Sequence, residues 1–329
     1  MAERRGAHNQ QFYSGVASPL TRSIDMNETS RVNSRARGLS WVLFAGLCLS
    51  TTPPIIKVGL NEAISPVPLL TFRLILAAVI LWIIFALFQP GKLRIDMYGL
   101  MGCALAGAAN GISLLFFYLA LTYISASVAT VIFSLTPIAT LLLLSLRGEP
   151  FTAINTVRFV LALAGVYLLI GPGGDVNIKG VILMAGVIVS FAIHLVLLQW
   201  RLSLYPTQTV TLYTISFMAL VSGIVYLFQP PQWPAFSGAG WGVIIWTAVV
   251  STAVARFAMF AGIRYIGSGQ TALLSPVETL LTVFWAMLIL GEHLSLIQLL
   301  GGALILTSAT LAAKRNRGRS IAPREEKSA

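Results

Sequence analysis

Charged residues are scarce in this sequence. Only 10% of its 329 residues are charged, whereas a soluble globular chain carries about 25%. Hydrophobic residues make up 57% of the chain, and the mean hydropathy is +0.83. Since so few charged side chains cannot cover a folded protein of this size, most of its surface must face something other than water.

Cysteine and histidine are also rare. The two cysteines, Cys48 and Cys103, fall inside apolar runs, so neither a disulfide framework nor a metal cluster is implied. The three histidines form no His-Glu zinc motif, and no Gly-rich phosphate loop or Gly-x-Ser-x-Gly elbow occurs. We therefore expect no cofactor. An integral membrane enzyme and a ligand-sensing membrane receptor without transport stay open as functions, and the absence of a filter-like ring argues against a channel.

The apolar residues gather in ten stretches, most of them close to the ~20 residues that cross a bilayer. The segments that join them are too short for a soluble domain and are mostly marked by Pro, Gly or Asn. The sequence therefore predicts an all-α membrane protein with ten transmembrane helices. The predicted spans are residues 38–60, 68–88, 98–121, 126–146, 155–171, 179–200, 209–228, 241–262, 270–290 and 295–313.

The basic residues indicate the orientation of these spans. With the N-terminus inside, eighteen of the 22 Lys and Arg residues are cytoplasmic and only Lys179 is outside. This asymmetry follows the positive-inside rule and places both termini in the cytoplasm. It also explains the net charge of +11 without nucleic-acid binding. We expect residues 1–37 to be a disordered cytoplasmic tail, because they lack the apolar core of a secretory signal, and residues 314–329 to be a basic cytoplasmic tail.

The second half of the chain repeats landmarks of the first. Tyr123-Ile124 precedes a Pro-containing span that leads to Gly148-Glu149, and Tyr265-Ile266 precedes another that leads to Gly291-Glu292. Since five helices in each copy is an odd number, the two copies must have opposite orientations. Inverted repeats are typical of transporters, whose binding site lies near the bilayer midplane between the repeats. The predicted five-helix repeats are residues 38–171 and 172–313.

Several short motifs resemble one known group of membrane proteins. The first span ends in Ile56–Gly59, Phe72-Arg73 opens the second, and residues 301–305 follow the second Gly-Glu turn. Together these resemble the drug/metabolite transporter superfamily, EamA type, over residues 38–313. The resemblance implies ten helices in two inverted repeats, alternating access and no ATPase. Since members carry diverse metabolites and drugs, membership does not identify the substrate.

The resemblance leads us to expect a secondary transporter in a bacterial inner membrane. Its expected partners are the lipid bilayer and a small polar or zwitterionic metabolite, such as an amino-acid-like compound, with possible proton or ion coupling. The habit of the family favours export. The sequence leaves the substrate, the coupling ion and the oligomeric state open.

Two cations in the outer halves of the first two spans are candidates for the substrate cavity. Lys57 follows Pro53-Pro54, which should bend or break the first helix. It either lines the cavity or extends its ammonium to the headgroups. Arg73 keeps its charge and needs a partner or water. That partner is either a carbonyl of the broken first helix or the substrate.

Three further candidates lie at similar depths in the inner halves of other spans. Glu278 is the only acid inside any predicted span, and Arg256 lies on the preceding antiparallel span. They form either a structural ion pair or a site in which Glu278 binds an amine or a proton. The resemblance implies an aromatic or apolar residue at the position of Arg256. His194 is either a core hydrogen-bonding residue or a pH-sensing residue of the cavity.

Asn110 completes the set of candidates. Its amide lies deep in the third span, where a few polar and aromatic side chains could line a cavity while most only pack. The candidate cavity residues are Lys57, Arg73, Asn110, His194, Arg256 and Glu278, with no catalytic residue and no metal ligand.

Overall fold

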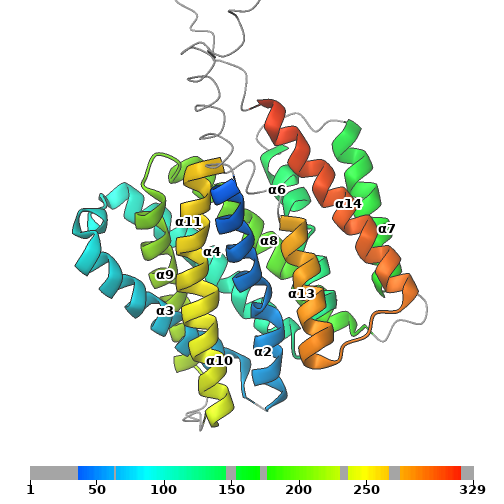
Figure 1. Cartoon of the computed structure of the whole chain (residues 1–329), viewed down its shortest axis with the longest axis horizontal. Coiled ribbons are helices and arrows are strands. Elements are labelled where there is room, and N and C mark those ends of the chain that lie inside the picture. Colours follow the sequence, from blue (N-terminus) through cyan, green and yellow to red (C-terminus); the bar gives the residue numbers. More distant parts are fainter. Residues whose placement is uncertain are drawn as a thin grey trace, which may run out of the picture.

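The computed structural model describes residues 36–62, 64–145, 153–170, 176–229, 236–266 and 275–319. Every regular element within these ranges is a helix (Figure 1), which confirms the predicted all-α class. Seven helical segments are long and apolar enough to cross a membrane, and three shorter apolar helices accompany them. The long segments are Ala36–Asn61, Pro66–Phe88, Met97–Ala120, Ala126–Ser145, Ile178–Arg201, Thr207–Leu227 and Gly238–Ile263. The shorter ones are Thr156–Leu169, Pro276–Leu290 and Leu296–Ser308.

Prolines break two of these segments. The first consists of a helix over residues 36–50 and α2 (Thr52–Asn61), with the interruption at Thr51, next to Pro53-Pro54. This confirms the predicted break, since the two prolines remove backbone donors. A second break separates α5 (Ala126–Phe133) from α6 (Thr136–Ser145). Pro137 cannot donate to the Phe133 carbonyl, and the Thr136 hydroxyl donates to it instead at 2.6 Å.

A third segment changes its helical winding. Between α10 (Gly238–Ala248) and α11 (Ala255–Ile266), residues Val249–Val254 form the π-helix η2. Inside it, the Thr252 hydroxyl donates to the Thr247 carbonyl, five residues earlier, at 2.9 Å. Short π segments within α-helices are frequent at functional sites. This one ends two residues before Arg256.

Polar residues at the N-termini fix where several helices begin. The side chains of Asp96, Ser125, Asn177 and Ser237 each accept a hydrogen bond from a backbone amide in the first turn of the helix that follows. These bonds satisfy amides that have no partner within the helix. The remaining helices are α3 (Pro66–Phe88), the 3-10 helix η1 (Pro90–Leu93), α4 (Met97–Ala120), α7 (Ala153–Ile170), α8 (Ile178–Arg201), α9 (Thr207–Leu227), α13 (Ser275–Leu290) and α14 (Leu296–Arg319).

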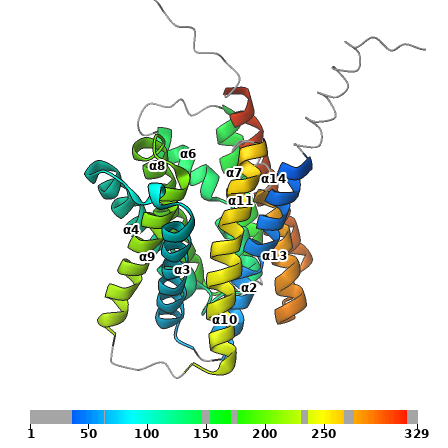
Figure 2. The same ribbon diagram turned by 60° about the vertical axis from the view of Figure 1, so that its left-hand side comes forward.

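The helix packing follows the same scheme in both halves of the chain. α4 of the first half packs on α8 of the second, and in the equivalent contact α10 of the second half packs on α2 of the first. In the same way, the contact of α4 with α9 corresponds to that of α10 with α3. Three pairs contact their own counterparts, namely α3 with α9, α5 with α13 and α7 with α14. The described chain begins and ends at the same end of the bundle (Figure 2).

Small residues permit the closest of these contacts. A methyl group on Gly301 would lie 2.6 Å from the Gly165 carbonyl oxygen, and one on Gly165 would lie 2.7 Å from the Gly301 carbonyl oxygen. The α7–α14 pair therefore meets backbone to backbone, as membrane helices with small residues do. Methyl groups on Gly38 and Gly180 would both clash at 2.5 Å, with Ile266 and Ile124 respectively. The repeated Tyr-Ile pairs thus pack on equivalent glycines.

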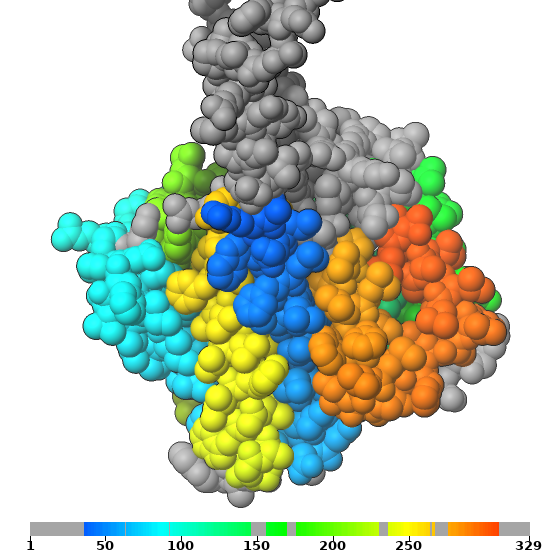
Figure 3. Space-filling view, viewed as in Figure 1, coloured from blue at the N-terminus to red at the C-terminus, as the bar shows by residue number. Residues whose placement is uncertain are grey.

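The outer surface of the bundle is apolar. Large hydrophobic side chains such as Ile83, Leu220 and Leu288 are exposed. Figure 3 shows one such face, on which α10, α2 and α13 lie side by side. Apolar surface of this extent suits contact with lipid.

Candidate functional site

Arg73 lies at the junction of three helices in the interior. Its side chain is buried on α3, and Nη1 donates to the Tyr118 hydroxyl of α4 at 2.8 Å. Nη2 donates to the Thr252 hydroxyl of η2 at 3.4 Å. Nε has no hydrogen-bond partner among the described residues. The guanidinium is therefore held by neutral hydroxyls of α4 and η2, and these partners differ from the first-span carbonyls considered above.

Arg256 lies two residues after the π-helix, and its side chain is exposed. It interacts electrostatically with Glu278 of α13 and with Arg73, and also with His194 of α8. Because an extra residue in a π turn rotates the helix that follows, η2 determines the direction in which Arg256 points. Arg256 thus interacts electrostatically with three of the other predicted candidates, Arg73, His194 and Glu278.

Glu278 lies in the first turn of α13 and is partly buried. The positive end of the helix dipole stabilises a carboxylate at this position. Glu278 and Arg256 attract each other, yet within the part of the chain that the structure describes, no hydrogen bond or direct ion pair joins them. The two opposite charges thus attract each other without a direct contact.

His194 and Asn110 are buried and contact other helices of the bundle. The buried His194 ring donates from Nδ1 to the Ala106 carbonyl oxygen of α4 at 2.9 Å. This bond is the one expected of a core hydrogen-bonding histidine. One turn further along α4, the Asn110 amide nitrogen donates to the sulfur of Met218 at 3.4 Å. The Asn110 Oδ1 has no partner among the residues described and remains available as an acceptor.

Lys57 lies apart from these residues, near the end of α2. Its ammonium donates to the carbonyl oxygens of Leu121 and Ile124, the latter at 3.1 Å. Both carbonyls belong to the end of α4 and the connection that follows it. Four of the sequence candidates therefore form one electrostatic group, Arg73, His194, Arg256 and Glu278, with Asn110 and Lys57 outside it.

The list of candidate cavity residues omitted three polar residues that make interhelical contacts in the structure. Tyr118 and Thr252 hold the Arg73 guanidinium, and Glu292 binds the first amides of α5. Tyr118 and Thr252 are single hydroxyls in apolar helices, with no pattern that marks them. For Glu292 a signal existed, because its Gly-Glu turn occurs in both repeats.

A polar contact at the other end of the bundle joins two loops. Tyr205, in the α8–α9 connection, donates to Oδ1 of Asp96 at 2.6 Å, and the same oxygen accepts from the Gly99 amide at 3.2 Å. The hydrogen bond from Tyr205 holds the pKa of the Asp96 carboxyl below its ordinary value. The same bond raises the pKa of Tyr205 to about 12. The contact therefore favours the ionised form of the Asp96 carboxyl and the protonated form of the Tyr205 hydroxyl.

The substitution Tyr205→Phe is expected to lower the melting temperature slightly at neutral pH, with the difference from wild type vanishing in acid. A lowered carboxyl pKa contributes stability above the unfolded value, and this stability is lost as the pH falls through the folded value. Thermal unfolding in detergent from about pH 3 to pH 8 measures the effect. The exposed Tyr123 offers the control Tyr123→Phe. A difference of constant size at every pH would refute the role assigned to Asp96.

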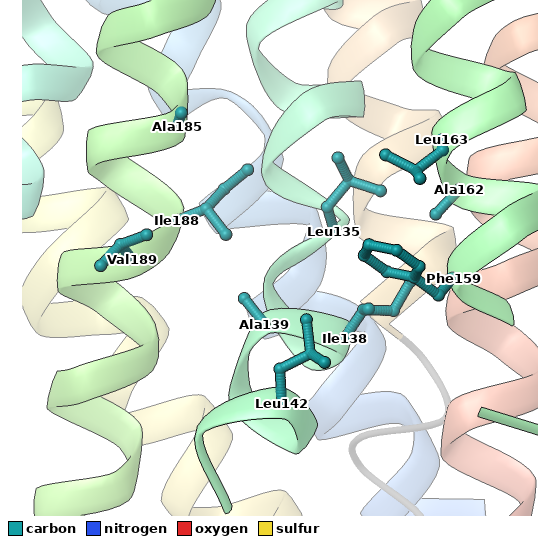
Figure 4. Close-up of a pocket in the computed structure, with 10 residues that line it drawn as sticks. All are labelled: Leu135, Ile138, Ala139, Leu142, Phe159, Ala162, Leu163, Ala185, Ile188 and Val189. Carbon is teal, nitrogen blue, oxygen red and sulfur yellow. The ribbon is translucent and has the colours of Figure 1, made fainter. Parts of the chain in front are cut away.

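An apolar pocket of about 190 Å³ lies between α6, α7 and α8 (Figure 4). All ten residues that line it are apolar, so nothing in it can bind a polar solute. This pocket is separate from the charged group and adds no chemistry to it. Its lining consists of Leu135, Ile138, Ala139, Leu142, Phe159, Ala162, Leu163, Ala185, Ile188 and Val189.

The chain is similar to known transport proteins along most of its length. The model of the EamA-like transporter family matches twice, over residues 36–171 and 178–313. An "Uncharacterized transporter YcbK" of Bacillus subtilis (strain 168) is 26% identical over 293 residues, which are 83% of this chain and 92% of that protein. An "Uncharacterized transporter" of Archaeoglobus fulgidus is 27% identical over 188 residues, or 56% of this chain and 66% of the relative.

A solved crystal structure has a similar fold. It superposes with a TM-score of 0.57 at 19% sequence identity, and the match covers 88% of this chain and 99% of the other. At this level of identity the likeness concerns the fold alone.

Proposed function

Because the chain belongs to the EamA-like transporter family and is an integral multi-pass membrane transporter, we propose that it carries a small zwitterionic metabolite, such as an amino-acid-like compound. We propose ten spans in two inverted five-helix repeats, with both termini cytoplasmic, in a bacterial inner membrane. The positive-inside distribution of the basic residues supports this topology. The family match to each half of the chain supports the two repeats.

One observation carries the substrate proposal. Arg256 and Glu278 have opposite charges, lie on different helices, α11 and α13, and attract each other without direct contact among the residues described. A permanent structural pair would form direct charge-assisted hydrogen bonds, which are the strong ones. A substrate with both a carboxylate and an ammonium satisfies the two residues together. Arg73 adds positive charge on the carboxylate side.

The two halves of the chain supply the two sides of this site. Arg73 belongs to the first repeat, whereas His194, Arg256 and Glu278 belong to the second. Rocking of one repeat against the other would expose such a site to each side of the membrane in turn. We propose this alternating access as the transport mechanism, with export as its direction and Glu278 as the group able to couple transport to protons.

Exchange in proteoliposomes tests the proposed function. Vesicles loaded with a mixture of amino acids and other small metabolites, with or without a pH gradient, are expected to exchange zwitterionic solutes faster than protein-free vesicles. Mass spectrometry of the vesicle contents measures the exchange. A folded protein that moves no solute under any gradient would refute the carrier and favour an enzyme or receptor. Net movement of a zwitterion only into the compartment that corresponds to the cytoplasm would refute export.

A further inference from the structure

The α4–α5 connection is held by charged side chains from two other helices. Glu292, which follows α13, accepts from the Ala126 amide at 2.7 Å through one carboxylate oxygen and from the Ser127 amide at 2.9 Å through the other. These amides open α5 and have no acceptor within the helix. The carboxylate thus binds the positive end of α5 with both oxygens.

Lys57 holds the other side of the same connection. Its ammonium donates to the Leu121 and Ile124 carbonyl oxygens, where α4 ends and the negative end of a helix dipole attracts a cation. Lys57 and Glu292 also interact electrostatically with each other. The α4–α5 connection is therefore bound by Lys57 at two carbonyl oxygens and by Glu292 at two amides. We call these four hydrogen bonds the clasp.

The clasp joins the two repeats at one end of the bundle. α2 and α5 belong to the first repeat and α13 to the second, and each of these three helices contacts the other two. α5 and α13 run antiparallel, since Ser134 meets Thr279 at 3.0 Å near one end while Ala126 meets Glu292 near the other. Lys57 belongs to α2, and in Figure 1 α2 lies at the end of the bundle opposite the one at which the described chain begins and finishes. The clasp therefore closes the bundle at the end away from residues 36 and 319, where the described chain begins and finishes.

The same three helices carry buried polar atoms that have no hydrogen-bond partner among the described residues. The Thr52 hydroxyl of α2, the Ser127 hydroxyl of α5 and the Trp285 indole nitrogen of α13 are buried and have no partner among the described residues. A buried polar group without a partner disfavours the state that buries it. The charge-assisted bonds of the clasp oppose this cost. The stability of the closed arrangement thus depends on the clasp bonds on one side and the unpaired buried groups on the other, and a single substitution can change it.

We propose that Lys57 and Glu292 form a gate, which closes one mouth of the bundle through the clasp and opens when α5 separates from α2 and α13. This gating role rests on the proposed alternating access. The hydrogen bonds and the buried groups without partners are features of the structure and do not depend on that proposal. The gate differs from the charged site, because neither residue belongs to the Arg73, Arg256 and Glu278 group.

Thiol labelling measures opening of the gate without any substrate. Ser127 is fully buried beneath the clasp, so Ser127→Cys reports access to this interface. Cys48→Ala and Cys103→Ala remove the native thiols. In protein in nanodiscs, Glu292→Gln is expected to raise the rate at which a water-soluble maleimide labels the reporter by about tenfold, because it removes the charge-assisted bonds. Lys57→Met is expected to act in the same direction and provides a second reading if Glu292→Gln fails to fold.

Control variants distinguish opening of the gate from a general loosening of the helix packing. Glu62→Gln removes an exposed carboxylate at the end of α2, and Lys179→Met removes an exposed ammonium at the start of α8. Neither is expected to change labelling at Ser127→Cys. Ser222→Cys places a reporter at an equally buried site on α9, which Glu292→Gln should leave unlabelled. The proposal is overturned if neither clasp variant changes labelling at Ser127→Cys, or if labelling at Ser222→Cys rises equally. Since labelling needs no transport, a failed exchange assay leaves this result interpretable.

Discussion

Replacing Glu278 by Gln is expected to slow zwitterion exchange in proteoliposomes by about 10- to 100-fold. The amide keeps the size of the side chain but removes the only acid found within the predicted spans. A hydrogen bond to a charged group contributes ~1.5–3 kcal/mol, which corresponds to roughly that range in rate or affinity. The initial rate of exchange measures the effect. Glu62→Gln is the matched control, because Glu62 is exposed at the end of α2.

A second substitution at the same site distinguishes the two ends of the substrate. Arg256→Gln is expected to weaken binding of solutes with a carboxylate and to affect amines that lack a carboxylate much less. Glu278→Gln should affect amines with and without a carboxylate alike. Wild-type exchange by Glu278→Gln would make Glu278 a structural residue and leave the proposed substrate class without support.

The substitution Gly301→Ala is expected to destabilise the protein by about 1–3 kcal/mol, the usual result of overpacking. The added methyl group would lie 2.6 Å from the Gly165 carbonyl oxygen and 2.9 Å from the Leu169 amide nitrogen. Both atoms belong to the backbone, so the clash cannot be relieved by turning a side chain. α14 must move away from α7. Thermal unfolding in detergent measures the loss.

The neighbouring glycine provides a control within the same helix. A methyl group on Gly302 would have its nearest neighbours at 3.8 and 3.9 Å, which is ordinary van der Waals contact. Because alanine favours a helix over glycine by ~1 kcal/mol, Gly302→Ala is expected to be neutral or slightly stabilising. Equal melting temperatures for the two variants would contradict the close approach of α7 and α14.

Much of the architecture could be predicted from the sequence, because few backbone structures can span a bilayer. Apolar runs long enough to cross it must form helices, since no water is present to satisfy the backbone. Prolines break two of these helices as their missing donors require, at Pro53-Pro54 and near Pro137. The repeated Tyr-Ile pairs, which indicated the internal repeat, occupy equivalent places in the structure, where each pair packs on a glycine.

The candidate site was only partly predictable. Arg73, Arg256 and Glu278 stood out because ionisable residues are rare within membranes. The π-helix before Arg256 has no signature in the sequence, and so the direction of that side chain could not be derived. The partners of Lys57 are backbone carbonyls of a distant helix end. Backbone acceptors exist at every residue, so the sequence gives no indication of which ones a lysine will reach.

The contacts between equivalent helices have a consequence for the origin of the fold. α3 meets α9, α5 meets α13, and α7 meets α14, so each of these helices touches the copy of itself. Two separate half-length chains, inserted in opposite orientations, would make the same contacts with each other. In this sense the protein retains the interface of an antiparallel homodimer, with the connection between α7 and α8 as a covalent tether.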